Sequence, residues 1–387
     1  MKSQKPTTDY WFLIEPYVFI SVTKEYVLLY NTLDGVSLES DKVEVNQLLR
    51  ETVQEDNCGV VFLNNERYQQ KHIHVFIKNL REKFMGDIID VALSKGKPIQ
   101  LLPYFNYIHK HVVYKNLNSF LYKDVLDNLF EISIHVDETT NLKKLIPFLR
   151  SILRISRFNI IGNIGNVPNY KELLSLLDGY SSTKYILCSY KDIISLHPVF
   201  EISYSYIISV YFPVDIHQWN ISRQILINKK IGLKYIFYVS SNEDCLQAEQ
   251  LIEQFGIDDF QMKPFFTGDN IRFFKENVFL HKDDLFSTPI SIKELFARQS
   301  INIYDFGKIQ IMPNGDVYAN INHPVLGNIS TNSINEIVLY EMDKGISWFR
   351  IRNQVPCCNC IYQWLCPSPS DYEIVLGCPN LCHVKQF

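Results

Sequence analysis

This chain lacks several features that would assign it to a membrane, to secretion or to a nucleic acid. None of its uninterrupted apolar runs reaches the ~18 residues that a membrane span needs, so we expect no span. The first nine residues are polar and carry no secretory cleavage pattern, which favours the cytoplasm. The formal net charge of -4 offers no general attraction to nucleic-acid phosphates, so we expect no nucleic-acid partner.

Motifs of common hydrolases and nucleotide-binding enzymes are also absent. The sequence contains neither a Gly-x-Ser-x-Gly elbow nor a Gly-x4-Gly-Lys phosphate loop. The ten histidines are dispersed, and the two closest pairs, His72 with His74 and His109 with His111, lie two residues apart. On a helix this spacing points the rings in different directions, so neither pair predicts a metal site.

Cysteine is the residue whose distribution is informative. Of the nine cysteines, Cys58, Cys188 and Cys245 are scattered, whereas the rest lie between positions 357 and 382. Because thiols stay reduced in the cytoplasm, such a cluster indicates metal ligation before disulfides. The clustered residues are Cys357, Cys358, Cys360, Cys366, Cys378 and Cys382.

Hydrophobic periodicity indicates an α/β protein with three domains, as expected from ~100–200 residues per domain. The middle domain alternates six apolar strands with amphipathic helices, which predicts a parallel sheet with right-handed crossovers. Six such units can form an open barrel or a doubly wound sheet, and periodicity alone does not choose between them. We place the domains at residues 1–95, 96–300 and 301–387.

The outer domains are predicted from the same patterns. In the first, three strands, at residues 17–23, 26–32 and 36–40, lead into helices, as in a winged-helix-like module. The second helical region of this domain is expected over 72–93, where Met85-Gly86 is a candidate break. In the last domain a helix is expected over 346–352, and the cysteine-rich tail should be irregular.

The spacing Cys357-x2-Cys360-x5-Cys366, with Cys382 or Cys378 further on, supplies four thiolates. Thiolates are soft donors that select zinc or iron–sulfur clusters, and a two-residue gap lets two sulfurs face one metal centre. Four thiolates suit a tetrahedral zinc and a [4Fe–4S] cube equally well. A purely structural metal that stabilises the tail is also compatible with this pattern.

The cysteine-rich tail resembles the SPASM domain, a C-terminal extension of radical SAM peptide maturases. The resemblance rests on PCCNCIYQWLCPSPS at 356–370, DYE at 371–373 and PNLCH at 379–383. Upstream, PNGDVY at 313–318 and LGNI at 326–329 are similar to the strand-turn and "LGN" segments of that domain. Over nearly its whole length, the chain is similar to the pseudo-radical-SAM proteins of Gly-Gly-leader peptide systems in Bacteroidales.

This resemblance implies a partial (β/α)6 radical-SAM-like barrel between an N-terminal peptide-recognition module and a C-terminal SPASM-like metal-binding domain. An exposed third strand of the N-terminal module could then accept an extended leader peptide as an added strand. Val36 and Leu38 on that strand, with Val45 and Leu49 on the following helix, are expected to line the groove. Each of these four residues could equally belong to the core of the module.

The chain departs from radical SAM enzymes at their defining motif. Those enzymes carry Cys-x3-Cys-x2-Cys in the loop after the first barrel strand, and the three thiolates leave one iron free to bind S-adenosylmethionine. The matching loop here, residues 137–142, has no cysteine, and the motif occurs nowhere in the sequence. We therefore do not expect S-adenosylmethionine as a cofactor. Gly162 and Gly165, after the second strand, are similar to a glycine-rich segment of those enzymes, but we favour an ordinary strand-to-helix turn.

The SPASM pattern is eroded as well. Two positions that are usually cysteine are Asn320 and Ser370 here, so the resemblance implies that the first auxiliary cluster is lost. The ligands of the second cluster are retained, and the PNLC match favours the distal cysteine at 382 over the one at 378, with Cys358 as a bystander. The implied ligands are Cys357, Cys360, Cys366 and Cys382.

The sequence therefore predicts a catalytically silent accessory protein in the maturation of a ribosomally synthesised peptide. It would bind the precursor and an active radical SAM partner and hold one [4Fe–4S] cluster, or a zinc ion. One alternative is a peptide maturase with residual redox chemistry through its C-terminal cluster. Another is a zinc-stabilised interaction protein unrelated to peptide maturation.

Overall fold

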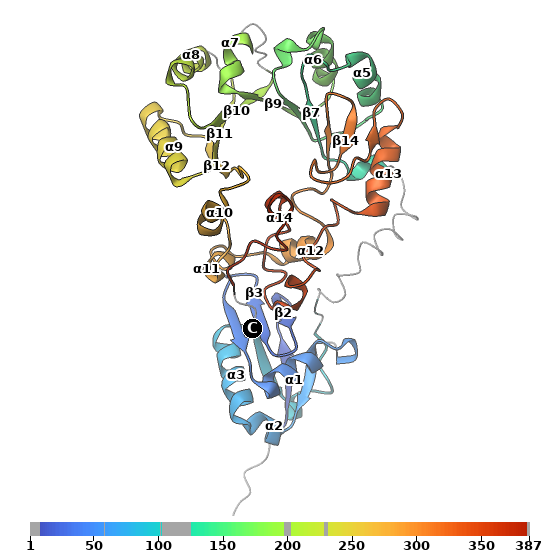
Figure 1. Ribbon diagram of the computed structural model, residues 1–387. Coiled ribbons are helices and arrows are strands. Elements are labelled where there is room, and N and C mark those ends of the chain that lie inside the picture. The colour runs from blue at the N-terminus through green and yellow to red at the C-terminus, as the bar shows by residue number, and fades with distance from the viewer. Residues whose placement is uncertain are drawn as a thin grey trace, which may run out of the picture.

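The N-terminal module contains two antiparallel sheets of three strands each, with helices packed against them (Figure 1). The computed structural model describes residues 8–57, 59–100, 102, 125–196, 203–227 and 231–384, which leaves Cys58, His109 and His111 outside the described residues. The sheet orders are β2–β3–β4 and β5–β1–β6. The elements are β1 Tyr10–Ile14, β2 Val18–Val22, β3 Val27–Asn31, β4 Ser37–Ser40, α1 Val43–Thr52, β5 Val60–Leu63, α2 Asn65–Gln69, α3 Lys71–Glu82 and β6 Gly86–Asp90.

The three strands expected near the N-terminus are present as β2, β3 and β4, but β1 and β6 are additional. The helix expected to reach residue 93 ends at Glu82, after which Phe84 adopts a positive φ of 54°. Gly86 then approaches β1 so closely that an added Cβ would lie 2.4 Å from the Leu13 carbonyl oxygen. A larger residue at position 86 would collide with β1, so glycine is needed where β6 begins to pair with that strand.

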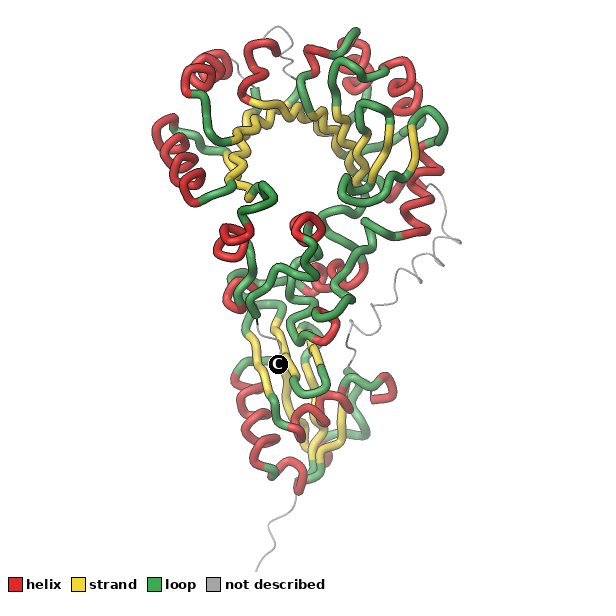
Figure 2. Tube along the Cα trace, viewed as in Figure 1, coloured by secondary structure: helices red, strands yellow, loops and turns green. Residues whose placement is uncertain are grey.

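Six parallel strands of the middle segment follow one another in sequence order and form a curved sheet, with helices on its convex side (Figure 2). A doubly wound sheet would reverse its strand order at a switch point, so the order observed here excludes that alternative. The strands are β7 Glu131–His135, β8 Arg157–Ile161, β9 Thr183–Ser189, β10 Ser205–Tyr211, β11 Leu233–Val239 and β12 Phe260–Pro264. The helices are α5 Leu142–Arg150, α6 Tyr170–Asp178, α7 Ile193–Leu196, α8 Ile216–Ile227 and α9 Asn242–Phe255.

Polar and apolar residues alternate along β7, which shows that the two faces of the curved sheet differ in character there. In β7, Ile132 and Ile134 are buried in the core beneath the helices, whereas His135 faces the concave side, where its Nε2 lies 3.0 Å from Gln310 Oε1. A parallel sheet covered on both faces would instead be apolar in continuous runs. The concave face therefore carries polar side chains.

The first strands of the C-terminal segment extend the same sheet. Strand β13 (Lys308–Ile311) pairs in parallel with β7, and two antiparallel strands, β14 (Asp316–Tyr318) and β15 (Gly327–Asn328), complete nine strands. The order is β12–β11–β10–β9–β8–β7–β13–β14–β15. Helix α13 (Ile334–Lys344) then packs its buried residues into the core of the sheet.

A second core joins the N-terminal module to the end of the chain. Helices α10 (Ile271–Asn277), α11 (Lys282–Leu285) and α12 (Ile292–Ser300) lead from the sheet towards this core (Figure 1). The backbone N–H of Ile290 donates to the buried Tyr30 hydroxyl at 2.8 Å. Side chains from the tail that enter the core are Ile351, Ile361, Tyr362, Trp364 and Leu365.

The tail differs from the sequence prediction in two places. The helix expected over 346–352 is absent, because Gly345 ends α13 in a left-handed conformation and the buried Glu341 carboxylate accepts from the N–H groups of Ser347 and Trp348. The tail itself, expected to be irregular, contains α14 (Asp371–Leu376), whose first turn is closed by a capping box between Ser370 and Glu373.

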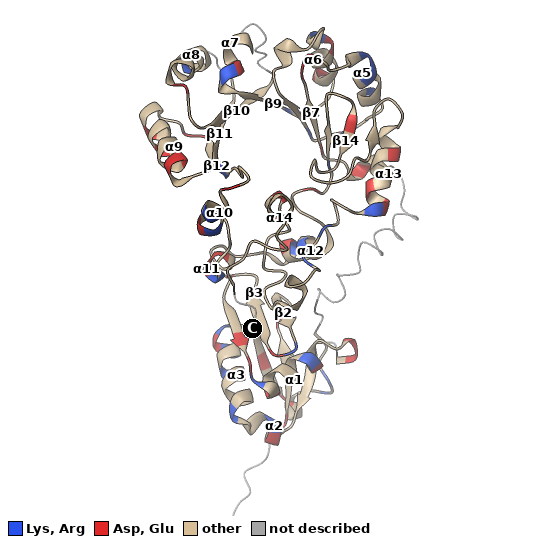
Figure 3. Ribbon diagram, in the orientation of Figure 1, with Lys and Arg blue, Asp and Glu red and all other residues tan. Residues whose placement is uncertain are grey.

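Acidic and basic residues are interspersed along the molecule, in keeping with its formal net charge of -4 (Figure 3). Among the helices of the described residues, none combines the length and the apolar character that crossing a bilayer requires.

Gly162, at the end of β8, provides a test of this fold. Its φ is +118°, and an added Cβ would lie 2.4 Å from the Val136 carbonyl oxygen. Replacing Gly162 with alanine should therefore cost more than the ~1–2 kcal/mol of a left-handed residue alone. We expect the thermal unfolding midpoint, measured by circular dichroism, to fall clearly.

Gly256→Ala is the matched control, because Gly256 has a φ of +55° but open space around its Cβ position. This control should show only the backbone cost of about 1 kcal/mol. Equal midpoints for the two variants would contradict the close packing of β8 against the loop after β7.

Candidate metal centre in the C-terminal segment

Short turns position the four cysteines that the sequence predicts as ligands. A 3-10 helix over Cys357–Asn359 is closed by the Cys360 N–H, which donates to the Cys357 carbonyl at 3.0 Å. The Cys366 N–H donates to the Tyr362 carbonyl at 3.0 Å in a second turn. Cys382 lies in an isolated bridge to Leu280, so a contact distant in sequence places its side chain.

These four cysteines line one small cavity. Cys357, Cys360, Cys366 and Cys382 surround a volume of about 20 Å³, beside Arg352. Burial, with smaller contributions from the other cysteines, raises the pKa of the Cys366 thiol to about 12. Burial likewise raises the pKa of Cys360 and of Cys382, and neighbouring cysteines add to both shifts. The four sulfurs are thus close enough to repel one another as thiolates, and a bound cation would offset that repulsion.

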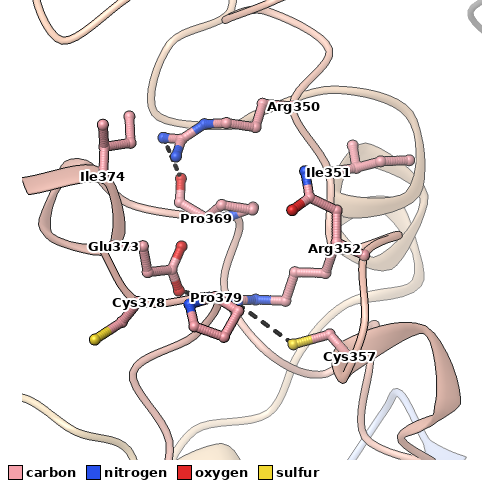
Figure 4. A pocket seen from close by; sticks show the side chains of 10 residues that line it. Arg350, Ile351, Arg352, Cys357, Pro369, Glu373, Ile374, Cys378 and Pro379 are labelled. Atoms are coloured by element: carbon pink, nitrogen blue, oxygen red, sulfur yellow. Dashed lines mark hydrogen bonds and ion pairs between the residues drawn. The ribbon is translucent and has the colours of Figure 1, made fainter. Parts of the chain in front are cut away.

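Cys378, the alternative fourth ligand, lies outside this cavity. It lines a neighbouring pocket of about 220 Å³, where its sulfur lies 3.7 Å from the Leu376 carbonyl oxygen. Figure 4 shows the Cys378 sulfur directed away from the Cys357 side chain. Cys358 is exposed and lines neither space. The geometry therefore favours Cys382 over Cys378.

Arg352 and Glu373 form a buried ion pair beside the four thiols, which sequence reasoning missed. The Arg352 Nη2 lies 2.9 Å from Glu373 Oε1, and its Nη1 lies 4.0 Å from the Cys357 sulfur. Their side chains are only 8% and 5% exposed. The Arg352 guanidinium would offset part of the negative charge of a bound metal–thiolate group, since four thiolates outweigh the charge of a zinc ion or a [4Fe–4S] core. Nothing in the sequence marks this pair, because its members are distant along the chain.

The residues fit a metal group by their chemistry, but their side chains are not yet directed at a common centre. Within the described part of the chain, no group of three or more His, Cys, Asp or Glu side chains is arranged to hold a metal ion in this conformation. The cavity of about 20 Å³ has roughly the space of one water molecule. A single zinc ion would require rotation of the thiols, whereas a [4Fe–4S] cube would also require them to move outward.

Asn320 and Ser370, at the two positions that lack the expected cysteine, belong to a hydrogen-bonded network. The Asn320 amide donates to Asp305 at 3.0 Å and also to Asp371. Arg350 lies 3.6 Å from the Asp305 carboxylate, and its Nη1 donates to the Ser370 carbonyl at 3.3 Å. Burial, together with the Asp371 charge, raises the pKa of Asp305 to about 6. The side chain of Asn320 is thus engaged with protein partners.

The loop after β7 is closed by its own side chains. Asp137 Oδ1 accepts from the Thr139 N–H at 2.8 Å, and the Asp137 N–H donates to Thr140 Oγ1 at 2.9 Å. The two described cysteines of the curved sheet and its helices lie elsewhere, Cys188 in the core on the convex side and Cys245 on α9. After β8, the Gly165 N–H donates to the Asn163 side chain at 3.1 Å, which is an ordinary turn.

The four residues predicted to line a peptide groove separate into two pairs. Val45 and Leu49 are 1% and 0% exposed, in the core between α1 and the two N-terminal sheets, so their side chains are not accessible to a peptide. This part of the prediction is corrected: α1 turns its apolar face inward. Val36 and Leu38 are half-buried, Leu38 on β4, which is an outer strand of its sheet.

Comparisons with known proteins give no family assignment. No protein-family model matches the chain, and no curated protein matches it. Crystal structures of Escherichia coli MccB with ATP and with succinimide show 17% and 16% identity, at TM-scores of 0.19 and 0.20. A third, with selenomethionine MccA, shows 16% identity and a TM-score of 0.18. Each covers 68% of this chain and 85% of MccB, but similarity at this level carries no argument about function.

Paired serine substitutions test the ligand set. We expect Cys382→Ser to lower the metal content of anaerobically purified protein strongly, because a coordinating sulfur is lost. Cys378→Ser, the matched control, should retain the metal content of the unmodified protein. Metal and acid-labile sulfide are measured together, so that zinc and a [4Fe–4S] cluster are distinguished. Equal depletion in both variants would contradict the assignment of Cys382.

The network around Asp305 predicts a pH dependence of stability. Because the folded pKa of about 6 exceeds the unfolded value of 3.8, the native state binds more protons between these pH values. Stability from this group is present below pH ~4 and lost as the pH rises through ~6, by about 3 kcal/mol. Asp305→Asn removes this ionisation. The difference between the unfolding midpoints of Asp305→Asn and of the unmodified protein should therefore shift in favour of the variant as the pH is raised from 4 to 7. Asp258→Asn, at an exposed position, should show no such trend.

Proposed function

We propose that the chain is a catalytically degenerate, radical-SAM-like accessory protein. It acts in the maturation of a ribosomally synthesised peptide, where it binds the precursor and an active radical SAM maturase. The observation that carries this proposal is a contrast in where the sulfurs lie. The loop after β7 is a closed turn without cysteine, whereas four cysteines line one cavity in the tail.

The shape of the middle segment supports the proposal. Six parallel strands in sequence order, curved and covered by helices on the convex side only, are the arrangement expected of a partial (β/α)6 barrel. A radical SAM enzyme of this architecture needs three thiolates at the loop after its first strand. Residues 137–142 supply hydroxyl and carboxylate groups there instead, so this loop offers no thiolate to the iron that binds S-adenosylmethionine.

Precursor binding is assigned to β4, at the edge of its three-stranded sheet. An extended leader peptide would add to this edge through backbone hydrogen bonds, with Val36 and Leu38 contacting its side chains. Helix α1 supports the strand from within the core through Val45 and Leu49 rather than touching the peptide.

The metal site is assigned to Cys357, Cys360, Cys366 and Cys382, with one [4Fe–4S] cluster, or zinc in its place. Cys360 and Cys366 also pack against the core that joins the tail to the N-terminal module. A bound metal would therefore crosslink the tail at that junction and stabilise it. A cluster there would in addition be able to carry an electron, and the alternative function, a maturase with residual redox chemistry, depends on that property.

Reconstitution with S-adenosylmethionine tests the proposal. We expect the full chain, reconstituted anaerobically with iron and sulfide and supplied with dithionite, to form no 5'-deoxyadenosine. An active radical SAM peptide maturase, assayed in parallel, provides the positive control. Formation of 5'-deoxyadenosine by this chain alone would refute the accessory role and favour the enzymatic alternative.

Co-purification tests the partners. We expect the tagged chain to retain both the precursor peptide and the active maturase under anaerobic conditions. Leu38→Asp should lose the precursor while its unfolding midpoint stays that of the unmodified chain. This result would assign the contact to β4. Failure to retain either partner would contradict the proposal.

A further inference from the structure

Strand β12 is the last strand at one end of the curved sheet, and its outer edge has no partner strand among the described residues. It pairs with β11 on one side only, and Figure 1 shows it at the end of the arc. An unpaired edge presents backbone N–H and C=O groups that can bind another extended chain. Proteins commonly protect such edges from unwanted pairing.

Two backbone hydrogen bonds between β11 and the β12 segment determine which residues face the free edge. The Tyr235 N–H donates to the Asp259 carbonyl at 2.9 Å, and the Phe265 N–H donates to the Val239 carbonyl at 2.7 Å. In a parallel pair, alternate residues direct both backbone groups to the same side. Gln261 and Lys263 therefore bond to β11, whereas Phe260 and Met262 direct their N–H and C=O groups outward.

The free edge ends at Pro264. Proline has no N–H, and the outward carbonyl of Pro264 already accepts a hydrogen bond from the Tyr372 hydroxyl at 2.8 Å. The edge therefore offers the four backbone groups of Phe260 and Met262, which suits a short extended segment.

Side chains on the two faces of β12 differ in character. Phe260 and Met262 project to the convex side and are 41% and 37% exposed. Lys263 projects to the concave side, and no carboxylate in the described part of the chain forms an ion pair with it. Lys234 and Lys308 also act electrostatically on Lys263, and Lys234 forms an ion pair with Asp259 at 3.5 Å, which leaves Lys263 as the unpaired cation of β12. A strand that fits here alternates apolar side chains on the convex side with carboxylates on the concave side.

We propose that a short acidic segment of the precursor peptide adds to β12 as a further strand of the curved sheet. Its backbone bonds to Phe260 and Met262, its apolar side chains cover these two residues, and its carboxylates meet Lys263. The source of the segment rests on the proposed function, whereas the edge and its charge do not. A second copy of this chain is the alternative occupant, because two antiparallel β12 edges would place Lys263 of one copy opposite Asp259 of the other, and sedimentation distinguishes it from a peptide.

Met262→Pro is the decisive variant. It removes one outward N–H and no hydrogen bond to β11, so the fold is retained, as the unfolding midpoint will show. The probe is a fluorescein-labelled peptide of alternating glutamate and valine, and its binding to the full chain is followed by anisotropy. We expect Met262→Pro to weaken binding about tenfold or more, and Met262→Ala, which keeps the N–H, to weaken it less.

Charge reversal at Lys263 gives an independent readout. Lys263→Glu should weaken binding of the glutamate–valine probe and strengthen binding of a matched lysine–valine probe. Absence of saturable binding to the unmodified chain, or equal binding by Met262→Pro, would overturn the inference. So would a concentration-dependent dimer in sedimentation that Met262→Pro abolishes, since a second copy would then occupy the edge.

The precursor itself separates this inference from the proposed function. If the unmodified chain retains the precursor and Met262→Pro retains it equally, the inference about β12 fails while the accessory role stands. A second outcome is that neither the unmodified chain nor Met262→Pro retains the precursor, while the glutamate–valine probe binds the unmodified chain and binds Met262→Pro more weakly. The accessory role then fails and the edge site stands.

Discussion

The attachment of the tail depends on the packing around one small cavity, which four half-buried cysteines line beside the buried Arg352. Burial raises the pKa of the Cys360, Cys366 and Cys382 thiols, which favours their protonated, uncharged form in the absence of a cation. The same turns that aim Cys360 and Cys366 at the cavity place their neighbours Tyr362 and Trp364 in the core shared with the N-terminal module. The same turns thus position the cysteines at the cavity and attach the tail to the N-terminal module.

Much of the fold was predictable because burial is one-sided. The six middle strands are marked by apolar residues that face the helices, and their order in the sheet follows their order in the sequence. Spacing groups Cys357, Cys360 and Cys366, because short turns place nearby sulfurs together. Spacing alone left Cys378 and Cys382 open and the resemblance favoured Cys382; in the structure a bridge to Leu280, about a hundred residues earlier, places Cys382 at the same cavity.

The remaining features depend on contacts that sequence periodicity does not report. Val45 and Leu49 have the helical spacing of either a core face or a groove, and only the packing of α1 assigns them to the core. The sequence after α13 has the apolar spacing of a helix. No helix forms there, because the Glu341 carboxylate accepts hydrogen bonds from the N–H groups of Ser347 and Trp348. Arg352 meets Glu373 across the tail, and no local pattern predicts that pair.

The bridge between Leu280 and Cys382 also has a mechanical consequence. The Leu280 N–H donates to the Leu381 carbonyl, and the His383 N–H donates back to the Leu280 carbonyl, so the distal cysteine is fastened to the connection between α10 and α11. That connection is the path by which the chain leaves β12 for the N-terminal module. A bound metal that moved the Cys382 sulfur would therefore act directly on the connection between α10 and α11.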